Sequence, residues 1–272
     1  MECKVSVEES TTLVKARIAK RQSLPAELIR SARVRAFGAV DESSPTRALD
    51  AVVLANTLVG YGENISLENM VIIENVIKFA KLEANYEVPG NEPEAWYRAF
   101  VKCMEDAGCF IADSGYSVYK KSTMQLTMNN IVVDIVQAGV AAAKAAIPGA
   151  TVLSAIADST LDALKKEPEA INLLNREAVQ DKGVRLAVLP CDQLKNGIIL
   201  ASLSSIDSIG GNNETSPLFF NWKTTNRSIF RGSAYITFNP LRYAALKDSF
   251  EEYLGEHFKA ALSKRFQRRK TK

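Results

Sequence analysis

The stretch "NNIVVDIVQAGVAAAKAAIPGATVLSAIADSTLDAL", residues 129–164, sets the architecture that the rest of the chain must accommodate. It is rich in alanine and branched apolar residues, and Pro148–Gly149 interrupts it near the middle, which predicts two helices joined by a turn. A membrane-crossing helix needs roughly 20 mainly apolar residues. Here Asp134 and Lys144 leave only residues 135–143 uncharged between them, and Asp158 follows the break at Pro148–Gly149. The stretch therefore predicts a helical hairpin buried within protein.

The polar residues of this hairpin fall in two narrow stripes, one on each helix. Their spacing follows the helical period, so each helix is apolar over most of its circumference. The members are Asp134, Gln137 and Lys144 on the first helix and Ser154, Asp158, Asp162 and Lys165 on the second. A second interpretation stays open, in which the hairpin unpacks and enters lipid. Each carboxylate at mid-bilayer would then cost roughly 2.5–3.5 kcal/mol unless a water-filled pore received it.

The N-terminal half is predicted to be helical, because capping residues and prolines precede runs with helical spacing and glycines follow several of them. Ser66, for example, precedes a run whose apolar positions Val71, Ile72, Val76 and Phe79 form one stripe. The predicted helices cover residues 24–37, 44–60, 66–84 and 92–108.

In the C-terminal half the apolar period changes from about 3.6 to 2, which is typical of half-buried strands. Asn196–Gly197 is a hairpin-turn signal, and Asn239–Pro240 caps and opens a last helix that continues to Phe266. The strand-like segments are 117–128, 184–189, 198–206, 217–222 and 228–238.

These patterns together predict an α+β fold. We expect a mostly antiparallel sheet of about five strands in the C-terminal half, packed with many helices, and a helical N-terminal half. Residues 1–112 form the helical region and residues 113–272 the α+β region with the alanine-rich hairpin at its centre. The two regions are expected to form one intertwined globular unit.

Catalytic motifs are absent from the sequence. The one histidine, His257, lies on an amphipathic helix, and the chain has no phosphate-binding P-loop, no G-x-G-x-x-G and no G-x-S-x-G. The four cysteines lack metal-ligand spacing. We therefore expect a protein that is not an enzyme and holds no metal or cofactor.

Charge gives a limited indication of partners. The formal net charge is only +3, and no aromatic platform alternates with the basic residues, so a nucleic-acid partner is not expected. Basic residues gather near both ends, and those at the C-terminus read as a solvated end or as contacts with an anionic surface or an acidic patch on a neighbouring subunit. The C-terminal candidates are Lys264, Arg265, Arg268, Arg269 and Lys270.

The N-terminus and the cysteines indicate a compartment. Charges stand where the apolar core of a signal peptide would be, and the few cysteines fit a reducing environment. We expect a cytoplasmic protein, with release that needs no cleaved signal peptide left open. Cys191, which follows Pro190 at the end of an apolar strand, is either a core thiol or the site of a thioester-linked acyl chain.

The alanine-rich pair of helices, "LPCDQL" with Cys191, and "FFNWKTTNRSIFRGSAYITFNPLRYAALKDSFEEYLG" at residues 219–255 resemble the Evf-type bacterial virulence factors. The resemblance implies a small α/β protein without a recognisable enzyme site, an acylated cysteine for which Cys191 is the candidate here, and persistence in an insect gut. Similar sequences are also associated with cytoplasmic tubules, the rhapidosome-like bodies.

These features lead us to expect one of two functions. The first is a structural subunit that assembles with copies of itself, or with a paralogue, into a cytoplasmic bacterial filament or tubule. The second is a lipid-associating, S-acylated virulence factor or pore-forming toxin, to which a lipid or membrane surface would be the partner.

Overall fold

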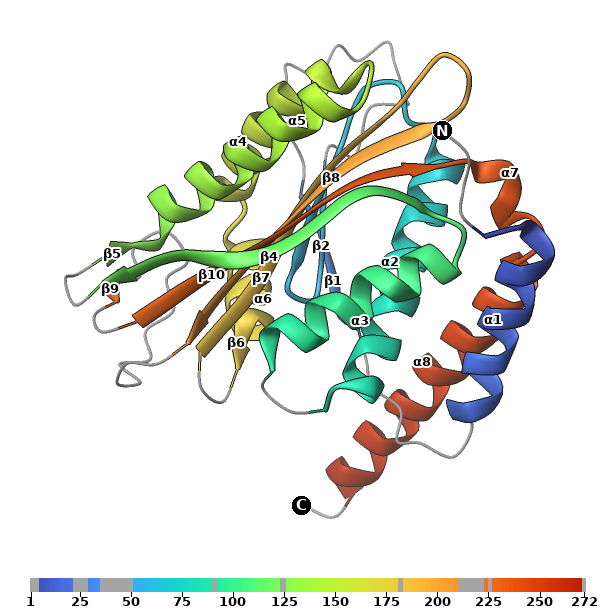
Figure 1. The fold of residues 1–272 in the computed structure, drawn as a ribbon. Coiled ribbons are helices and arrows are strands. Elements are labelled where there is room, and N and C mark those ends of the chain that lie inside the picture. Colours follow the sequence, from blue (N-terminus) through green and yellow to red (C-terminus); the bar gives the residue numbers. More distant parts are fainter. Residues whose placement is uncertain are drawn as a thin grey trace, which may run out of the picture.

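A mixed β-sheet forms the middle layer of the molecule, and helices cover both of its faces (Figure 1). The computed structural model describes residues 5–21, 29–34, 51–89, 92–122, 126–180, 183–209, 223–224 and 227–270. Its strand order is β1-β2-β3-β7-β8-β10-β4, with β6 paired to β7, which makes eight strands. The strands are β1 (Ser31–Val34), β2 (Ala51–Leu54), β3 (Thr57–Tyr61), β4 (Phe110–Ser122), β6 (Val179–Gln180), β7 (Gly183–Gln193), β8 (Ile199–Ile209) and β10 (Arg227–Phe238).

Two short strands, β5 (Leu126–Thr127) and β9 (Lys223–Thr224), form a separate antiparallel pair. The helices are α1 (Val7–Arg21), α2 (Leu67–Glu87), α3 (Pro93–Asp106), α4 (Met128–Ala146), α5 (Leu153–Lys165), α6 (Pro168–Ala178), α7 (Pro240–Tyr243) and α8 (Lys247–Lys270). A short 3-10 turn, Ala150–Val152, precedes α5.

The sheet separates two hydrophobic cores. On one face α4, α5 and α6 contribute Val136, Leu153 and Leu174, which pack against Val188 and Ile206 of the sheet. On the other face α1, α2, α3, α7 and α8 form a second core, which includes Val14, Phe79, Phe100, Tyr243 and Phe250. The α+β class predicted from the sequence is confirmed, with helices in two layers.

The N-terminal half is not wholly helical, and here the sequence prediction was wrong. Residues 51–60, expected within a helix over 44–60, form with Tyr61 the hairpin β2–β3, which turns at Ala55 with φ of 50°. Residues 31–34, expected within a helix over 24–37, form β1. The other residues of these two segments, apart from 29–30, lie outside the described ranges. Among the residues described, the main sheet therefore has eight strands rather than about five.

Strand β3 joins the two halves of the chain. It runs parallel to β7, with Tyr61 opposite Cys191, while the other strand pairs are antiparallel. The sheet is thus built from residues on both sides of the expected boundary at residue 112. The long sequence separation of this pair explains why local patterns did not reveal it.

Several predicted signals do position elements as expected. The Ser66 hydroxyl accepts a hydrogen bond from the Asn69 backbone N–H at 3.2 Å and begins α2. Asn239 caps α7 through the Leu241 N–H at 3.0 Å. Gly197, with φ of 86°, forms the turn between β7 and β8. Helices α1 and α6 were not expected, and the strand expected at 217–222 lies outside the described residues.

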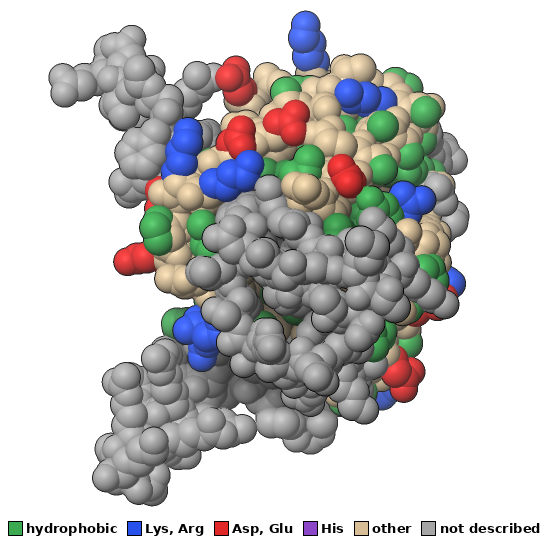
Figure 2. All heavy atoms as spheres, turned by 90° about the vertical axis from the view of Figure 1, so that its left-hand side faces the viewer, with side chains coloured by type: hydrophobic (Ala, Val, Ile, Leu, Met, Phe, Trp, Pro, Cys, Tyr) green, Lys and Arg blue, Asp and Glu red, His purple; other side chains and the backbone are tan. Residues whose placement is uncertain are grey.

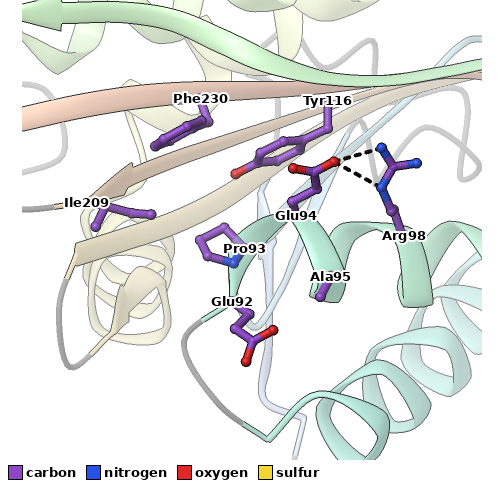
Figure 3. A pocket seen from close by; sticks show the side chains of 8 residues that line it. All are labelled: Glu92, Pro93, Glu94, Ala95, Arg98, Tyr116, Ile209 and Phe230. Carbon is purple, nitrogen blue, oxygen red and sulfur yellow. Dashed lines mark hydrogen bonds and ion pairs between the residues drawn. The ribbon is translucent and has the colours of Figure 1, made fainter.

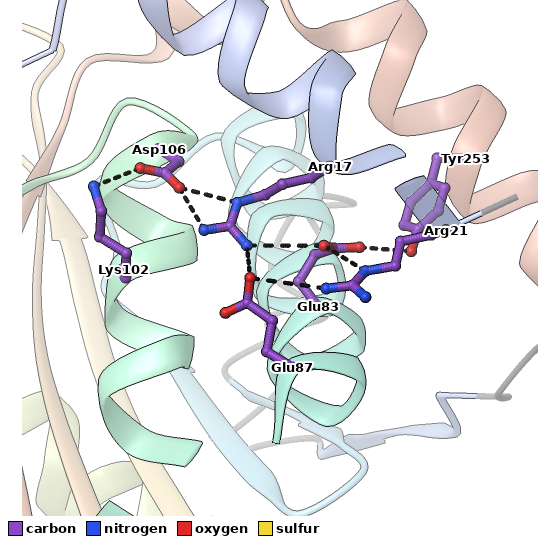
Figure 4. A network of polar contacts seen from close by, with 7 residues as sticks. All are labelled: Arg17, Arg21, Glu83, Glu87, Lys102, Asp106 and Tyr253. Atoms are coloured by element: carbon purple, nitrogen blue, oxygen red, sulfur yellow. Dashed lines mark hydrogen bonds and ion pairs between the residues drawn. The ribbon is translucent and has the colours of Figure 1, made fainter. Parts of the chain in front are cut away.

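A network of buried charges fixes α1 to the second core (Figure 4). The Arg17 guanidinium donates to the Asp106 carboxylate at 2.6 and 2.9 Å, and Arg21 donates to Glu83 at 3.2 Å. Glu83 also accepts from the Tyr253 hydroxyl of α8 at 2.8 Å. Two of the basic residues near the N-terminus thus have their acidic partners within the same chain.

Candidate functional site: the helical hairpin and the sheet beneath it

Helices α4 and α5 form the hairpin expected from residues 129–164, and it lies across the sheet (Figure 1). Helix α4 packs on β8 and β10, and α5 packs on β7 and β3. The turn uses Gly149 in a left-handed conformation, with φ of 87°, where a side chain would be strained. Pro148–Gly149 therefore ends the first helix as predicted.

The hairpin has one apolar face, which is buried, and one polar face, which is exposed to solvent. The apolar face is buried against the sheet, and its side chains include Ile131, Val132, Ile135, Val136, Val140, Leu153, Ile156, Leu161 and Leu164. The charged residues Asp134, Lys144, Asp158, Asp162 and Lys165 are exposed. The predicted polar stripes are confirmed, but the hairpin is an outer layer rather than the interior of the protein, since Ala138, Ala141, Ala142 and Ala145 are exposed as well.

Polar contacts of the hairpin join its two helices to each other. The Gln137 amide on α4 donates to the Asp158 carboxylate on α5 and accepts from the Ser154 hydroxyl at 3.1 Å. A contact from α4 to the sheet is weaker, because the Tyr119 hydroxyl lies 3.4 Å from the Asp134 carboxylate. The two helices are thus bound to one another by contacts that would persist if the pair moved as a unit.

The strand below α4 presents buried hydroxyl groups to the hairpin. Ser202 and Ser204 of β8 are at most 1% exposed, and their Oγ atoms have no hydrogen-bond partner among the residues that the structure describes. A β-carbon built on Gly139 of α4 would lie 2.6 Å from the Ser204 Oγ, so the helix backbone lies directly over this serine. A buried hydroxyl without a partner costs roughly 1–3 kcal/mol. This interface is therefore weaker than an apolar one of equal area.

Sequence reasoning missed these serines. They alternate with apolar residues in "LASLSSI", and that alternation was taken only as evidence for a strand. Their position beneath the hairpin depends on the pairing of β8 with β7 and β10, which no local pattern reveals.

Cys191, the expected acylation site, lies on the other side of the sheet from the hairpin. Its thiol is 0% exposed, belongs to the core of α1, α2, α3, α7 and α8, and donates to the Gly60 carbonyl at 3.0 Å. Burial, with a smaller effect from neighbouring Asp192, raises the pKa of this thiol well above its ordinary value. An acyl chain could reach it only before folding or after the core opens, and acylation stays a prediction.

The predicted basic contacts lie at the end of α8, which extends to Lys270. The side chains of Lys264, Arg265, Arg268, Arg269 and Lys270 fall outside the described part, so their contacts with an anionic surface or a neighbouring subunit stay a prediction. On the face shown in Figure 2, the described basic and acidic side chains are interspersed with hydrophobic ones.

Catalytic or metal-binding constellations do not emerge among the residues that the structure describes. No group of three or more His, Cys, Asp or Glu side chains there could hold a metal ion. His257 packs on Tyr253 at a ring distance of 4.3 Å, and its Nε2 lies 2.8 Å from the Tyr86 hydroxyl. This histidine joins α8 to α2. Within the same described ranges, no helix is both long and apolar enough to cross a bilayer.

No family model matches the chain, and no curated protein matches it by sequence. Among solved structures, an activated Cyt2Ba monomer from Bacillus thuringiensis subsp. israelensis is 7% identical with a TM-score of 0.40, covering 66% of this chain and 96% of its own. The Evf virulence factor is 12% identical with a TM-score of 0.38, covering 90% and 89%. A delta-endotoxin is 11% identical with a TM-score of 0.35, covering 79% and 92%. These values amount to a weak resemblance of fold and identify no function.

Proposed function

We propose that this protein associates with lipid surfaces and that the α4–α5 hairpin is the element that does so. The observation that supports this most is the asymmetry of the hairpin. Its apolar face rests on a strand with two hydroxyls that lack a hydrogen-bond partner within the described ranges, while Gln137, Ser154 and Asp158 bind its two helices to each other. The pair can therefore leave the sheet without losing the contacts that hold it together.

The hairpin would lie along the lipid surface rather than cross it. An amphipathic helix in the interfacial plane buries its apolar face about 5–10 Å into the boundary between headgroups and acyl chains. The exposed charges, among them Asp134, Asp158 and Asp162, would stay in water. This placement avoids the roughly 2.5–3.5 kcal/mol for each carboxylate that a transmembrane position would cost.

A disulfide between α4 and β8 tests this proposal. A β-carbon on Gly139 would lie 3.9 Å from the Ser204 β-carbon, within the 3.5–4.5 Å typical of disulfides. In the variant Gly139→Cys/Ser204→Cys, with Cys3→Ser to remove a further thiol, the oxidised protein should neither bind liposomes nor release an encapsulated dye. Reduction of the same sample should restore both.

The matched controls separate locking from misfolding. The single variant Ser204→Cys should respond equally to oxidant and reductant, and circular dichroism should be unchanged by oxidation of the double variant. If the locked protein binds liposomes as well as the reduced one, the hairpin is not the lipid-binding element.

A second candidate function, self-assembly, is favoured by one observation on the sheet. Strand β4 (Phe110–Ser122) pairs with β10 on one side, and among the described strands it is the end of the sheet. An edge strand can pair with a strand from another copy of the chain. Light scattering at increasing concentration should then show growth that Val118→Lys on β4 prevents, while Leu241→Lys on α7 has no effect. A monomer at every concentration would exclude this function.

A further inference from the structure

A pocket of about 490 Å³ lies on the face of the sheet opposite the hairpin (Figure 3). The first turns of α3 form one wall, with Glu92, Glu94 and Arg98. Strands β4, β8 and β10 form the other wall, where β4 contributes Tyr116 and β10 contributes Phe230. Apolar side chains of Pro93, Ala95 and Ile209 complete the lining. The proposed lipid contact of the hairpin does not use this pocket.

Two aromatic rings form the sheet side of this pocket. Tyr116 and Phe230 are stacked with ring centroids 5.8 Å apart and an angle of 14° between their planes. Figure 3 shows both rings above Pro93, with the Glu94 carboxylate near Tyr116. An aromatic face attracts a cation within about 6 Å of the ring centroid. The two rings therefore offer a cation an extended electron-rich surface.

Buried polar residues of the sheet hold the Tyr116 ring in position through its hydroxyl. Its hydroxyl donates to the Asp207 carboxylate at 3.2 Å, and Asp207 accepts from Arg185 at 2.9 Å. Asp207 is 1% exposed and Arg185 is 6% exposed, so this support is buried. Burial and the neighbouring Asp207 raise the pKa of the Tyr116 phenol, which stays neutral. The aromatic wall is thus preorganised and needs no ligand to order it.

Carboxylates give the pocket an excess of negative charge. Glu92 and Glu94 line it together with one guanidinium, that of Arg98, which donates at 2.7 and 3.1 Å to a single oxygen of Glu94. This pair fixes the Glu94 carboxylate and leaves its other oxygen outside the pair. The lining carries a net charge of −1, which suits a ligand with one positive charge and disfavours an anion.

We propose that this pocket binds a quaternary ammonium group. Aromatic faces together with carboxylates recognise such groups, because the diffuse charge of a methylated nitrogen is attracted to both. The side chains of Pro93, Ala95 and Ile209 have no hydrogen-bond acceptor, so they favour methyl groups over the N–H donors of a primary ammonium. The group could be carried by a choline lipid headgroup or by a free small molecule, and the chemistry at the pocket is the same.

Titration with choline chloride tests the assignment, with 3,3-dimethyl-1-butanol as the uncharged control of the same shape. In NMR spectra of the full chain, choline should shift the amide resonances of Ala95 and Ile209, and the alcohol should bind at least about fivefold more weakly. Phe230→Leu, which keeps an apolar side chain but removes the ring, should weaken choline binding by about fivefold. Phe230→Tyr should preserve it.

Further variants test whether the protein folds normally and where the ligand comes from. Glu94→Gln changes an exposed residue and should weaken choline binding, whereas Glu169→Gln on α6 should not. If the ligand is a choline lipid headgroup, Phe230→Leu should weaken binding to phosphatidylcholine vesicles. If the ligand is a free small molecule, Phe230→Leu should leave vesicle binding unchanged. The oxidised Gly139→Cys/Ser204→Cys protein should bind choline normally, because the pocket is independent of the hairpin. Equal binding of choline and the alcohol, or no effect of both Phe230→Leu and Glu94→Gln, would overturn the assignment.

Discussion

Lys81 places an ionisable amine in the middle of the second core. It is 4% exposed, its ammonium donates to the Thr57 hydroxyl at 2.8 Å and to the Asn56 side-chain carbonyl, and it lies 5.9 Å from the centre of the Trp96 ring. Burial, and secondarily the nearby Arg185 guanidinium, lowers the pKa of Lys81 to about 7. An ammonium with hydroxyl and amide partners is costly to bury, so Lys81 reduces stability when it is protonated.

The pH dependence follows from this lowered pKa. Between about pH 7 and the ordinary lysine pKa of 10.5, the unfolded chain binds the proton that the folded protein lacks, so stability should rise with pH through this window. Lys81→Met should raise the free energy of unfolding at pH 6 by about 1–3 kcal/mol and flatten its rise toward pH 9.5. Urea denaturation at the two pH values measures this. The exposed control Lys166→Met should retain the wild-type slope, and an equal slope in Lys81→Met would contradict the prediction.

At the scale of elements, α1 depends on a few buried ion pairs rather than on a large apolar face. Among its side chains Val14 is fully buried, and Arg17 joins it to Asp106 of α3. Asp106 and Glu83 have side-chain exposures of 3% and 0%. Without Arg17, Asp106 would keep Lys102, which is 55% exposed, as its basic partner at 2.7 Å, so most of the compensation of its buried charge would be lost.

Arg17→Ala should therefore lower the free energy of unfolding by about 3 kcal/mol. The exposed neighbour Lys15→Ala should change it by less than about 0.5 kcal/mol. Denaturant titration of both variants provides the measurement, and amide hydrogen exchange should show α1 opening first in Arg17→Ala. Equal stabilities of the two variants would show that this network contributes little.

The elements also show which features a sequence can predict. The caps Ser66 and Asn239 and the turn at Gly197 act through near neighbours, and they lie where the sequence placed them. Residues 51–61 misled the prediction because nearly all of them are buried, on both faces of the sheet, which gives a continuous apolar run without a period of 2. Strand β2 pairs locally with β3, but the second partner of β3 is β7, more than a hundred residues away, so the pairing that places this hairpin in the sheet leaves no local signal.

The two candidate sites differ in how far the sequence could predict them. The hairpin is one contiguous segment, and its amphipathic pattern and its turn could be predicted from the sequence alone. The pocket is assembled from α3, β4, β8 and β10, and the serines below α4 acquire their meaning from the fold. Tyr116 and Phe230 meet only because β4 and β10 are paired, so the aromatic wall could not be predicted.

At the scale of the whole molecule, the sheet separates two layers of different character. The layer of α1, α2, α3, α7 and α8 is held by buried ion pairs and aromatic contacts such as Phe79–Phe250, with ring centroids 4.6 Å apart. The hairpin layer is held to the sheet mainly by aliphatic side chains over buried serines. We infer that the hairpin moves while the opposite layer stays rigid, and that lipid moves the hairpin away from the sheet.

Distance measurement between spin labels tests that claim most directly. Ala141 on α4 and Ser117 on β4 are both exposed, so labelled cysteines there should not disturb either core, and Cys103, Cys109 and Cys191 are buried. With Cys3→Ser as background, double electron–electron resonance should give one narrow distance in solution. On phosphatidylcholine vesicles the distance should increase by at least about 10 Å, one helix diameter. An unchanged distance on vesicles that bind the protein would contradict the account.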